Sequence, residues 1–321
     1  ILVDEFELIR RFFSKDNNDA SVVLGVGDDG AIISPSPGHN LVVSTDTLIE
    51  NVHFPDCLPP EDIGYRCVAV NVSDIAAMGA RARWITLALT LPDVDEKWLQ
   101  KFSEGLYHAA QKYDVSLIGG DTTSAQQISL TISITGEVLP HQAITRSQAS
   151  RDELIFVTGS LGDAAAGLDL LINSSGSSEA EKFLMQRFSR PTARSEIGQA
   201  LCGVATAAID ISDGLYADTK KLLLSSELGG HLYVDRLPIS MQLKQIYNQE
   251  QRLKFALSGG DDYELLFTAP AIKLDEILKI SHIYNIPITE IGVVRNHSKL
   301  NCSLNDKLIN YDDNGYLHFN G

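Results

Sequence analysis

Residues 60–79 read PEDIGYRCVAVNVSDIAAMG, and this stretch decides the fold of the first half of the chain. It predicts one long helix, because Pro60 is favoured in a first helical turn and Gly79 is typical just past a helix end. Glu61 and Asp62 also lie in the first turn, where their negative charge complements the positive end of the helix dipole.

Strand patterns lie on both sides of this helix. Leu41–Thr47 precedes it and Arg83–Leu91 follows it, and both are rich in the β-branched and apolar residues that are typical of strands. A second helix is predicted from the capping residue Asp95 through Tyr113. Four further strands are predicted in this half, at Ser21–Val26, Ala31–Ser34, Val115–Ile118 and Ile128–Leu139.

The periodic pattern lapses around residues 140–151, which predicts a domain boundary there. It resumes with a strand at Leu154–Thr158 and a helix that begins at Asp163, after which helices and strands alternate. A chain of 321 residues is long enough to form two hydrophobic cores. The sequence therefore predicts an α/β (α+β) protein of two domains, residues 1–148 and residues 149–321.

The composition excludes several classes of function. The formal net charge of −16 and the pI near 4.8 disfavour binding to nucleic acid and to anionic membranes. No apolar run approaches the roughly 18–20 residues that are needed to span a bilayer. The four cysteines form no CxxC pair, which predicts free thiols in the cytoplasm rather than a disulfide framework or a zinc site.

Five short motifs place carboxylates beside glycine or hydroxyl residues. In four of them a strand pattern runs straight into the carboxylates, which predicts that they lie at strand ends, where ligands bind in open α/β sheets. In the other motif Asn71 and Asp74 are three residues apart near the end of the predicted helix, so they share a face. The motifs are GDDG at 27–30, STDT at 44–47, NVSD at 71–74, GGDT at 119–122 and DISDG at 210–214.

These motifs together predict a magnesium site. Each one alone also fits a turn or a helix cap, because Asp is common in both. Two carboxylates about 4 Å apart repel by about 4 kcal/mol at an effective dielectric constant near 20, so a cluster of them needs cations or protons. Oxygen ligands without His or Cys favour Mg²⁺ over zinc. Bound metal ions would also allow this acidic protein to accept phosphates.

Other nucleotide-binding motifs are excluded by their context. Residues 25–30, GVGDDG, satisfy the GxGxxG pattern of dinucleotide-binding loops. That pattern requires a helix to follow, whereas residues 31–37 are apolar and interrupted by proline. The chain contains no Gly-Lys pair, which excludes a Walker A loop, and it has neither the HRD nor the DFG motif of protein kinases.

In their order along the chain, the motifs resemble those of the thiamine-monophosphate kinase family from one end to the other. The resemblance rests on GVGDD at 25–29, STDTL at 44–48 with His53 and Phe54, AVNVSDIAAMG at 69–79, GGDTT at 119–123, TRS at 145–147, VTG at 157–159, IDISDG at 209–214 and SGGDDYE at 258–264.

The resemblance implies the two-domain fold shared with aminoimidazole ribonucleotide synthetase and selenophosphate synthetase. It implies that the N-terminal domains pair in a homodimer and that this domain binds ATP and Mg²⁺. It also implies the reaction, in which the γ-phosphoryl group of ATP passes directly and in line to thiamine monophosphate. The products are thiamine diphosphate and ADP, which makes this the final step of thiamine diphosphate biosynthesis.

The same resemblance implies a role for individual residues, with no covalent catalytic residue among them. The predicted ligands of several magnesium ions are Asp29, Ser44, Thr45, Asp46, Asp74, Asp121, Asp210 and Asp213. The predicted ATP contacts are Gly120, Asp121, Arg146 and Ser212. The predicted contacts to thiamine monophosphate are His53, Asp261 and Asp313.

The chain departs from the family pattern on the substrate side. Asp261 stands where the family usually has Glu, so its carboxylate lies one methylene closer to the backbone. Asp313 stands where the family has an aromatic residue that holds the substrate ring, and Tyr316 or Phe319 are the candidates to replace it.

Two alternatives to this function stay open at this point. One is another ATP-using enzyme of the same superfamily, although selenophosphate synthetase usually needs a reactive cysteine in its N-terminal segment and no cysteine precedes Cys57. The other is a non-catalytic sensor of magnesium and nucleotide. Such a sensor would keep the acidic motifs but would not need the substrate-side residues His53, Asp261 and Asp262, so their presence favours the enzyme.

Overall fold

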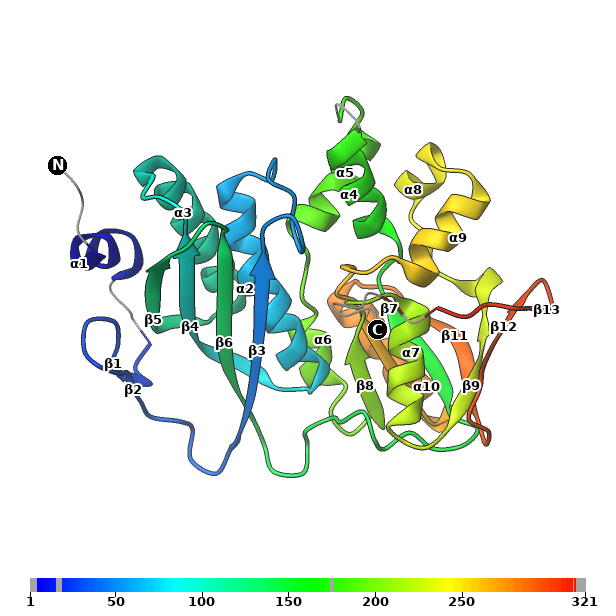
Figure 1. Cartoon of the computed structure of the whole chain (residues 1–321). Helices are drawn as coiled ribbons and strands as arrows, with labels where there is room; N and C mark the ends of the chain where they lie inside the picture. Colours follow the sequence, from blue (N-terminus) through cyan, green and yellow to red (C-terminus); the bar gives the residue numbers. More distant parts are fainter. Residues whose placement is uncertain (1–4, 16–18, 174–175, 314, 316–321) are drawn as a thin grey trace. The chain divides into compact units, whose positions relative to one another are not determined.

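The computed structural model describes residues 5–15, 19–173, 176–313 and 315 (Figure 1). The chain forms two compact units. Unit 1 contains Ile1–Ile75 and Ala80–His141, and unit 2 contains Ala76–Gly79 and Gln142–Gly321. Within the described residues, no helix has both the length and the apolar character that crossing a membrane requires.

Unit 1 is built on a four-stranded sheet in the order β3-β6-β4-β5 (Figure 1). β6 pairs antiparallel with both β3 and β4, and β4 pairs parallel with β5. A short two-stranded sheet of β1 and β2 and the N-terminal helical turns α1 and η1 complete the unit. The bounds are α1 (Glu5–Leu8), η1 (Ile9–Phe13), β1 (Val22–Leu24), β2 (Ile32–Ile33), β3 (Asn40–Ile49), β4 (Arg81–Leu91), β5 (Ser116–Ser124) and β6 (Ser129–Val138).

Helices α2 (Pro60–Ala77) and α3 (Glu96–Tyr113) lie on one side of this sheet (Figure 1). The predicted Asp95 cap is confirmed, because its side chain accepts hydrogen bonds from the backbone N–H groups of Lys97 and Trp98. The two helices approach closely at two glycines. A Cβ atom at Gly64 would lie 2.1 Å from a carbonyl oxygen of α3, and one at Gly105 would lie 1.8 Å from a carbonyl oxygen of α2.

The opposite face of the sheet in unit 1 is polar and exposed. Along β3 the side chains alternate, so Val42 and Leu48 are buried while Val43 is 65% exposed. On this open face Thr45 is hydrogen-bonded to Ser133 at 2.9 Å, and other hydroxyl pairs join neighbouring strands. This surface, which carries Val43, Thr45 and Thr47 of β3, is the open face of unit 1.

Unit 2 contains a seven-stranded sheet in the order β13-β12-β9-β11-β7-β10-β8. β12 pairs parallel with β9, and the other neighbouring strands pair antiparallel. The strands are β7 (Leu154–Thr158), β8 (Ala207–Asp210), β9 (Gly229–Tyr233), β10 (Leu265–Ala269), β11 (Ile288–Arg295), β12 (Leu300–Leu304) and β13 (Lys307–Ile309). The helices are α4 (Asp163–Asn173), α5 (Glu179–Ser189), α6 (Ser195–Ala200), α7 (Leu215–Leu224), η2 (Val234–Arg236), α8 (Met241–Ile246), α9 (Gln249–Ser258), η3 (Ala271–Lys273) and α10 (Leu274–Tyr284).

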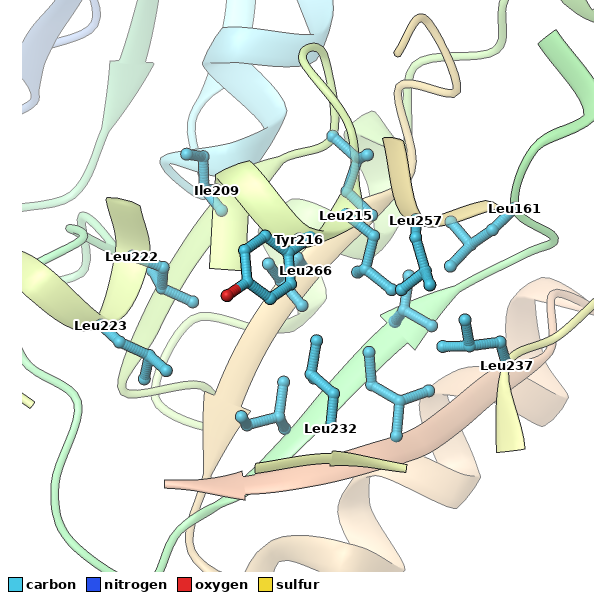
Figure 2. Packing of buried hydrophobic residues seen from close by; sticks show 14 of the residues in the cluster. Leu161, Ile209, Leu215, Tyr216, Leu222, Leu223, Leu232, Leu237, Leu257 and Leu266 are labelled. Carbon is cyan, nitrogen blue, oxygen red and sulfur yellow. The ribbon is translucent and has the colours of Figure 1, made fainter. Parts of the chain in front are cut away.

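Both faces of the sheet in unit 2 are buried. Leu266 of β10 belongs to one apolar cluster, whereas its neighbours Leu265 and Phe267 belong to the cluster on the other face with residues of α6 and α10. Figure 2 shows the first cluster, in which Leu215 and Tyr216 of α7 point toward the same apolar interior as the side chains of the sheet. Burial on both faces explains why β7 and β10 are almost entirely apolar in sequence.

The expectation that four acidic motifs lie at strand ends is wrong for two of them. Asp46 lies inside β3, which continues to Ile49, and Asp121 lies inside β5, which continues to Ser124. Each strand continues past its carboxylate because the following residues still pair with a neighbouring strand, β3 with β6 and β5 with β4. The sheet of unit 1 is also mixed rather than parallel, so it has no single edge where all strands end.

Helices α8 and α9 are absent from the predicted elements. Their start signals are present in the sequence, because Ser240 caps α8, and Asn248 forms a capping box with Gln251 at the start of α9. The helices themselves are short and only partly apolar, which left their periodicity too weak to detect.

The close approach of α2 and α3 should make the stability of the protein sensitive to any side chain at Gly105. We expect Gly105→Ala to lower the free energy of unfolding by about 3 kcal/mol, because a methyl group there meets the backbone of α2 rather than a side chain that can move. Chemical denaturation with circular dichroism measures this change. Gly30→Ala is the matched control, since a Cβ atom at Gly30 meets nothing within 4 Å. Equal unfolding midpoints for the two variants would contradict the prediction.

Candidate functional site

A cavity of about 950 Å³ in unit 1 contains three of the residues that the sequence singles out. It is lined by the loop between β1 and β2 and by strands β4 and β5, which bring Asp29 together with Gly120 and Asp121. Arg10 and Phe13 of the N-terminal turns line it as well. Negative, cationic and aromatic groups therefore share one cavity.

The carboxylates of this cavity are not neutralised by the protein. Within the described residues, neither Asp29 nor Asp121 forms an ion pair or a side-chain hydrogen bond with a cationic residue. Gly120 lies where β5 runs close against β4, since a Cβ atom there would be 2.0 Å from the carbonyl oxygen of Leu87. The cavity thus combines exposed backbone with carboxylates that can accept a cation.

A second group of predicted residues joins β3 to α2. The hydroxyl of Ser44 donates a hydrogen bond of 2.6 Å to Asp74 Oδ2. Ser44 and Asp46 are two residues apart on β3 and so point to the same face, toward α2. Three of the predicted magnesium ligands, Ser44 and Asp46 of β3 and Asp74 of α2, therefore lie where β3 faces α2.

Asn71 is not among the predicted ligands, but its side chain contacts the backbone of one of them. Its side chain is fully buried, its Oδ1 accepts a hydrogen bond of 3.2 Å from the backbone N–H of Asp46, and its Nδ2 donates to the carbonyl oxygen of Cys67. The amide thus fixes the backbone of Asp46 relative to α2. Its spacing of three residues from Asp74 was the signal that could have identified it.

Thr45 is separated from these ligands by the alternation of β3. Its side chain lies on the open face of unit 1, where it is hydrogen-bonded to Ser133 at 2.9 Å. The structure therefore does not bring the Thr45 hydroxyl to Ser44 and Asp74.

The imidazole of His53 is held by the strand that precedes it. Its Nδ1 accepts a hydrogen bond of 3.0 Å from the backbone N–H of Ile49, at the end of β3. A ring nitrogen that accepts a hydrogen bond carries no proton, so the neutral ring carries its proton on Nε2. His53 can therefore act as a hydrogen-bond donor through Nε2.

In unit 2 the DISDG motif forms the connection from β8 to α7. Asp210 ends β8 and is buried, as the strand-end expectation requires. The backbone N–H groups of Ser212 and Asp213 donate to Asp218 Oδ2 at 3.0 and 2.9 Å, which fixes the loop. Lys221 forms ion pairs with both Asp213 and Asp218.

The loop that carries Asp261 runs alongside this connection. The backbone N–H of Asp261 donates to the carbonyl oxygen of Ser212 at 2.9 Å, and that of Tyr263 donates to Ile211. Asp261 has φ +69° and Tyr263 has φ +50°, which is the left-handed region that non-glycine residues rarely adopt. Strained backbone of this kind is typical of functional sites. Ser212 and Asp261, which were predicted to contact ATP and substrate, are neighbours in this unit.

A buried ion network is centred on Glu264, three residues after Asp261. Glu264 is fully buried, and Arg194 donates to both of its oxygens, at 2.6 Å from Nε and at 2.5 Å from Nη2. Arg187 and Thr158 donate to the same carboxylate at 2.8 and 2.7 Å. These charge-assisted bonds hold the pKa of Glu264 below its usual value although burial opposes them.

Asp313 and Arg146 lie at separate places in unit 2. Asp313 accepts a hydrogen bond from the backbone of Gly315, which lies against Asp213. Thr145 pairs in parallel with Ala207 at the start of β8, and the Arg146 that follows it is exposed. Tyr316 and Phe319 lie outside the described residues.

The donor chemistry fits magnesium, although no complete coordination shell is preformed. In the residues that the structure describes, no three His, Cys, Asp or Glu side chains are close enough to hold a metal ion. Mg²⁺ usually keeps several waters and is bound by one or two carboxylates plus the phosphates of a substrate. The paired oxygen donors Ser44 and Asp74 and the unneutralised Asp29 and Asp121 match that mode of binding.

Comparisons with known proteins give the family and the fold. Residues 27–138 match the family model of AIR synthase related protein, N-terminal domain. The thiamine-monophosphate kinase of Haemophilus influenzae is 45% identical over 293 residues, which cover 90% of this chain and 89% of that protein. The crystal structure of thiamine-monophosphate kinase from Stenotrophomonas maltophilia K279a is 38% identical with a TM-score of 0.85, covering 91% of this chain and 93% of that one.

A third relative contains ligands. The structure of AaThiL complexed with AMPPCP and TMP is 31% identical with a TM-score of 0.79, covering 89% of each chain. These similarities confirm the resemblance that was drawn from the motifs, and they confirm the predicted α/β (α+β) fold.

The buried carboxyl of Asp262 should make the stability of the folded protein depend on pH. Burial raises its pKa to about 8 from 3.8, although the N–H groups of Gly162 and Ala164 oppose the shift. The folded state therefore binds one more proton than the unfolded state between these two pH values. The stabilisation from that proton is complete below pH 3.8 and is lost as the pH rises through about 8, by at most about 1.4 kcal/mol per pH unit.

We therefore expect Asp262→Asn to lose less stability than the wild type between about pH 5 and about pH 8, because the amide does not titrate. Urea denaturation across this pH range measures the difference. Asp93→Asn, at an exposed turn residue, is the control and is expected to follow the wild-type curve. Parallel curves for Asp262→Asn and the wild type would show that Asp262 is ionised in the folded state.

Proposed function

This chain belongs to the thiamine-monophosphate kinase family, and on that premise we propose that it transfers the γ-phosphoryl group of ATP to thiamine monophosphate in a magnesium-dependent reaction. The products are thiamine diphosphate and ADP. The observation that carries the proposal is the cavity of unit 1, where the unneutralised carboxylates of Asp29 and Asp121 adjoin the exposed backbone of Gly120.

The metal ligands that we propose are carboxylate and hydroxyl side chains of the acidic motifs. Bound Mg²⁺ would supply the positive charge that neutralises the phosphates and orients them for transfer. The protein's part is to hold the oxygen ligands in place, as Asn71 does for the backbone of Asp46 and as Ser44 does for Asp74. The proposed ligands are Asp29, Ser44, Asp46, Asp74, Asp121, Asp210 and Asp213. The hydroxyl of Thr45 is left out of this proposal because it lies on the open face of unit 1.

The proposed contacts to the two substrates are the residues that the family motifs imply. Gly120, Asp121, Arg146 and Ser212 contact ATP in this proposal. His53, whose protonated Nε2 can donate to a phosphate oxygen, Asp261 and Asp313 contact thiamine monophosphate. The AaThiL complex with AMPPCP and TMP supports a family site that accepts both a nucleotide and a monophosphate.

We propose direct transfer without a phosphorylated enzyme. Phosphoryl transfer depends mainly on positioning and charge neutralisation, so it needs no covalent residue. The hydroxyl of Ser44 already donates to Asp74, and the Nδ1 of His53 is engaged by the backbone. A chiral γ-phosphoryl group should therefore arrive with inverted configuration, whereas retention would identify a nucleophile among these residues.

We further propose that the enzyme is a cytoplasmic homodimer that pairs through unit 1. The open face of unit 1 exposes Val43 at 65% and Leu41 at 47%, beside hydroxyl pairs that could face a second copy. The cysteines are free, which is typical of a reducing compartment. Light scattering is expected to give about twice the chain mass of 35.0 kDa, and a mass of 35.0 kDa at micromolar concentration would contradict pairing.

The activity is tested by incubating the protein with ATP, Mg²⁺ and thiamine monophosphate and by separating the products chromatographically. We expect thiamine diphosphate and ADP in equal amounts, and we expect no turnover after exhaustive EDTA treatment. Other monophosphates provide the control for substrate identity. Turnover that survives EDTA, or a different preferred acceptor, would refute the corresponding part of the proposal.

Asp46→Asn tests the ligand assignment. We expect kcat to fall by about 10² or more with the fold intact, because the side chain changes while the backbone bond to Asn71 is retained. Asp93→Asn is the matched control, since Asp93 is exposed and lies outside the motifs. A kcat within about threefold of the wild type would exclude Asp46 as a key ligand.

A further inference from the structure

Lys221 is bound to a predicted metal ligand. It lies on α7, and its ammonium forms an ion pair with Asp213 and a second one, at 2.8 Å, with Asp218. Asp213 is one of the carboxylates to which we assign Mg²⁺, whereas neither Lys221 nor Asp218 belongs to any predicted set. A resident cation thus already occupies a carboxylate that is proposed to bind a metal.

The three residues differ in how freely they can move. Asp218 is completely buried, and its Oδ2 holds the loop by accepting the N–H groups of Ser212 and Asp213. The side chains of Asp213 and Lys221 are 32% and 41% exposed, so both can change conformation. Asp218 therefore anchors Lys221 through its other oxygen, and the bond between Lys221 and Asp213 is the one that can open.

Lys221 and a metal ion cannot share the same carboxylate oxygen at low cost. Mg²⁺ binds a carboxylate oxygen at about 2.0–2.1 Å and carries two positive charges. An ammonium at hydrogen-bonding distance from that oxygen would lie within a few ångströms of the ion, where like charges repel strongly. The lysine side chain, a compact charge on a flexible stem, can leave Asp213 and keep its bond to Asp218.

We propose that Lys221 is a positioning residue that competes with the divalent metal for Asp213. This inference rests on the proposed assignment of Asp213 as a ligand. In the metal-free protein Lys221 keeps the Asp213 side chain oriented beside the loop. When metal binds, Lys221 releases Asp213 and stays on Asp218, so that it sets the metal concentration at which the Asp213 position fills.

The test measures metal binding rather than turnover. Mn²⁺ binding to the full chain without nucleotide is followed by electron paramagnetic resonance, and the site at Asp213 is identified as the binding that Asp213→Asn removes. We expect Lys221→Gln to bind Mn²⁺ at that site about tenfold more tightly than the wild type, because a neutral amide forms no ion pair with Asp213 and does not repel the ion. Lys221→Arg keeps the charge and is expected to retain the wild-type affinity.

Lys220→Gln is the matched control. Lys220 is the preceding residue on α7 and pairs with Asp312 at 3.3 Å, and its replacement is expected to leave Mn²⁺ affinity at Asp213 unchanged. A second readout is the melting temperature. Mg²⁺ should raise it more in Lys221→Gln than in the wild type, since tighter binding to the folded state stabilises it more.

The outcomes separate this inference from the proposed function. Equal or weaker Mn²⁺ binding by folded Lys221→Gln overturns the competition while leaving Asp213 as a ligand. The same gain in Lys220→Gln would reduce the effect to general surface charge and would also overturn it. Mn²⁺ binding that Asp213→Asn does not change would overturn both this inference and the assignment of Asp213.

Discussion

The structure of this protein depends on how its carboxylates are neutralised. Carboxylates in the interior have partners within the chain: Glu264 has Arg194 and Arg187, and Asp218 has two backbone N–H groups and Lys221. A buried charge without such partners would be strongly destabilising. Asp29 and Asp121 in the cavity of unit 1 are exposed and lack cationic partners within the described residues, so a cation from solution can approach them. The carboxylates of the core and those of the candidate site therefore differ in what surrounds their charge.

The regular structure positions the site through simple periodicities. Alternation along β3 sends Ser44 and Asp46 toward α2 and sends Thr45 to the open face of unit 1. The spacing of three residues on α2 places Asn71 and Asp74 on the face that meets β3. In unit 2 the left-handed conformation of Asp261 lets its loop run beside the Ser212 connection. The buried amide of Asn71 contacts the backbone of β3, and the buried ion network of Glu264 lies next to the Asp261 loop.

Much of this architecture could be predicted from local signals. The long helix α2 was identifiable from Pro60 and Gly79, and α3 from its cap at Asp95, because such end signals act within a few residues. Helices α8 and α9 went unrecognised since short helices depend on packing more than on their own periodicity. Asp46 and Asp121 were expected at strand ends, yet pairing with neighbouring strands carries β3 and β5 past them. Strand length is decided by partners that are distant in the sequence.

The sequence by itself determined the excess of negative charge and the membership of a kinase family, and it predicted oxygen ligands in ordered motifs without a covalent nucleophile. These features are local, so they can be recognised without knowing the fold. Only the tertiary structure decided which of those residues meet. It joined Ser44 to Asp74 across 30 positions and Asp261 to Ser212 across two loops, and it placed the Thr45 hydroxyl on the open face of unit 1, away from Ser44. It also revealed Asn71 and Lys221, because their roles consist of contacts that exist only once the chain has folded.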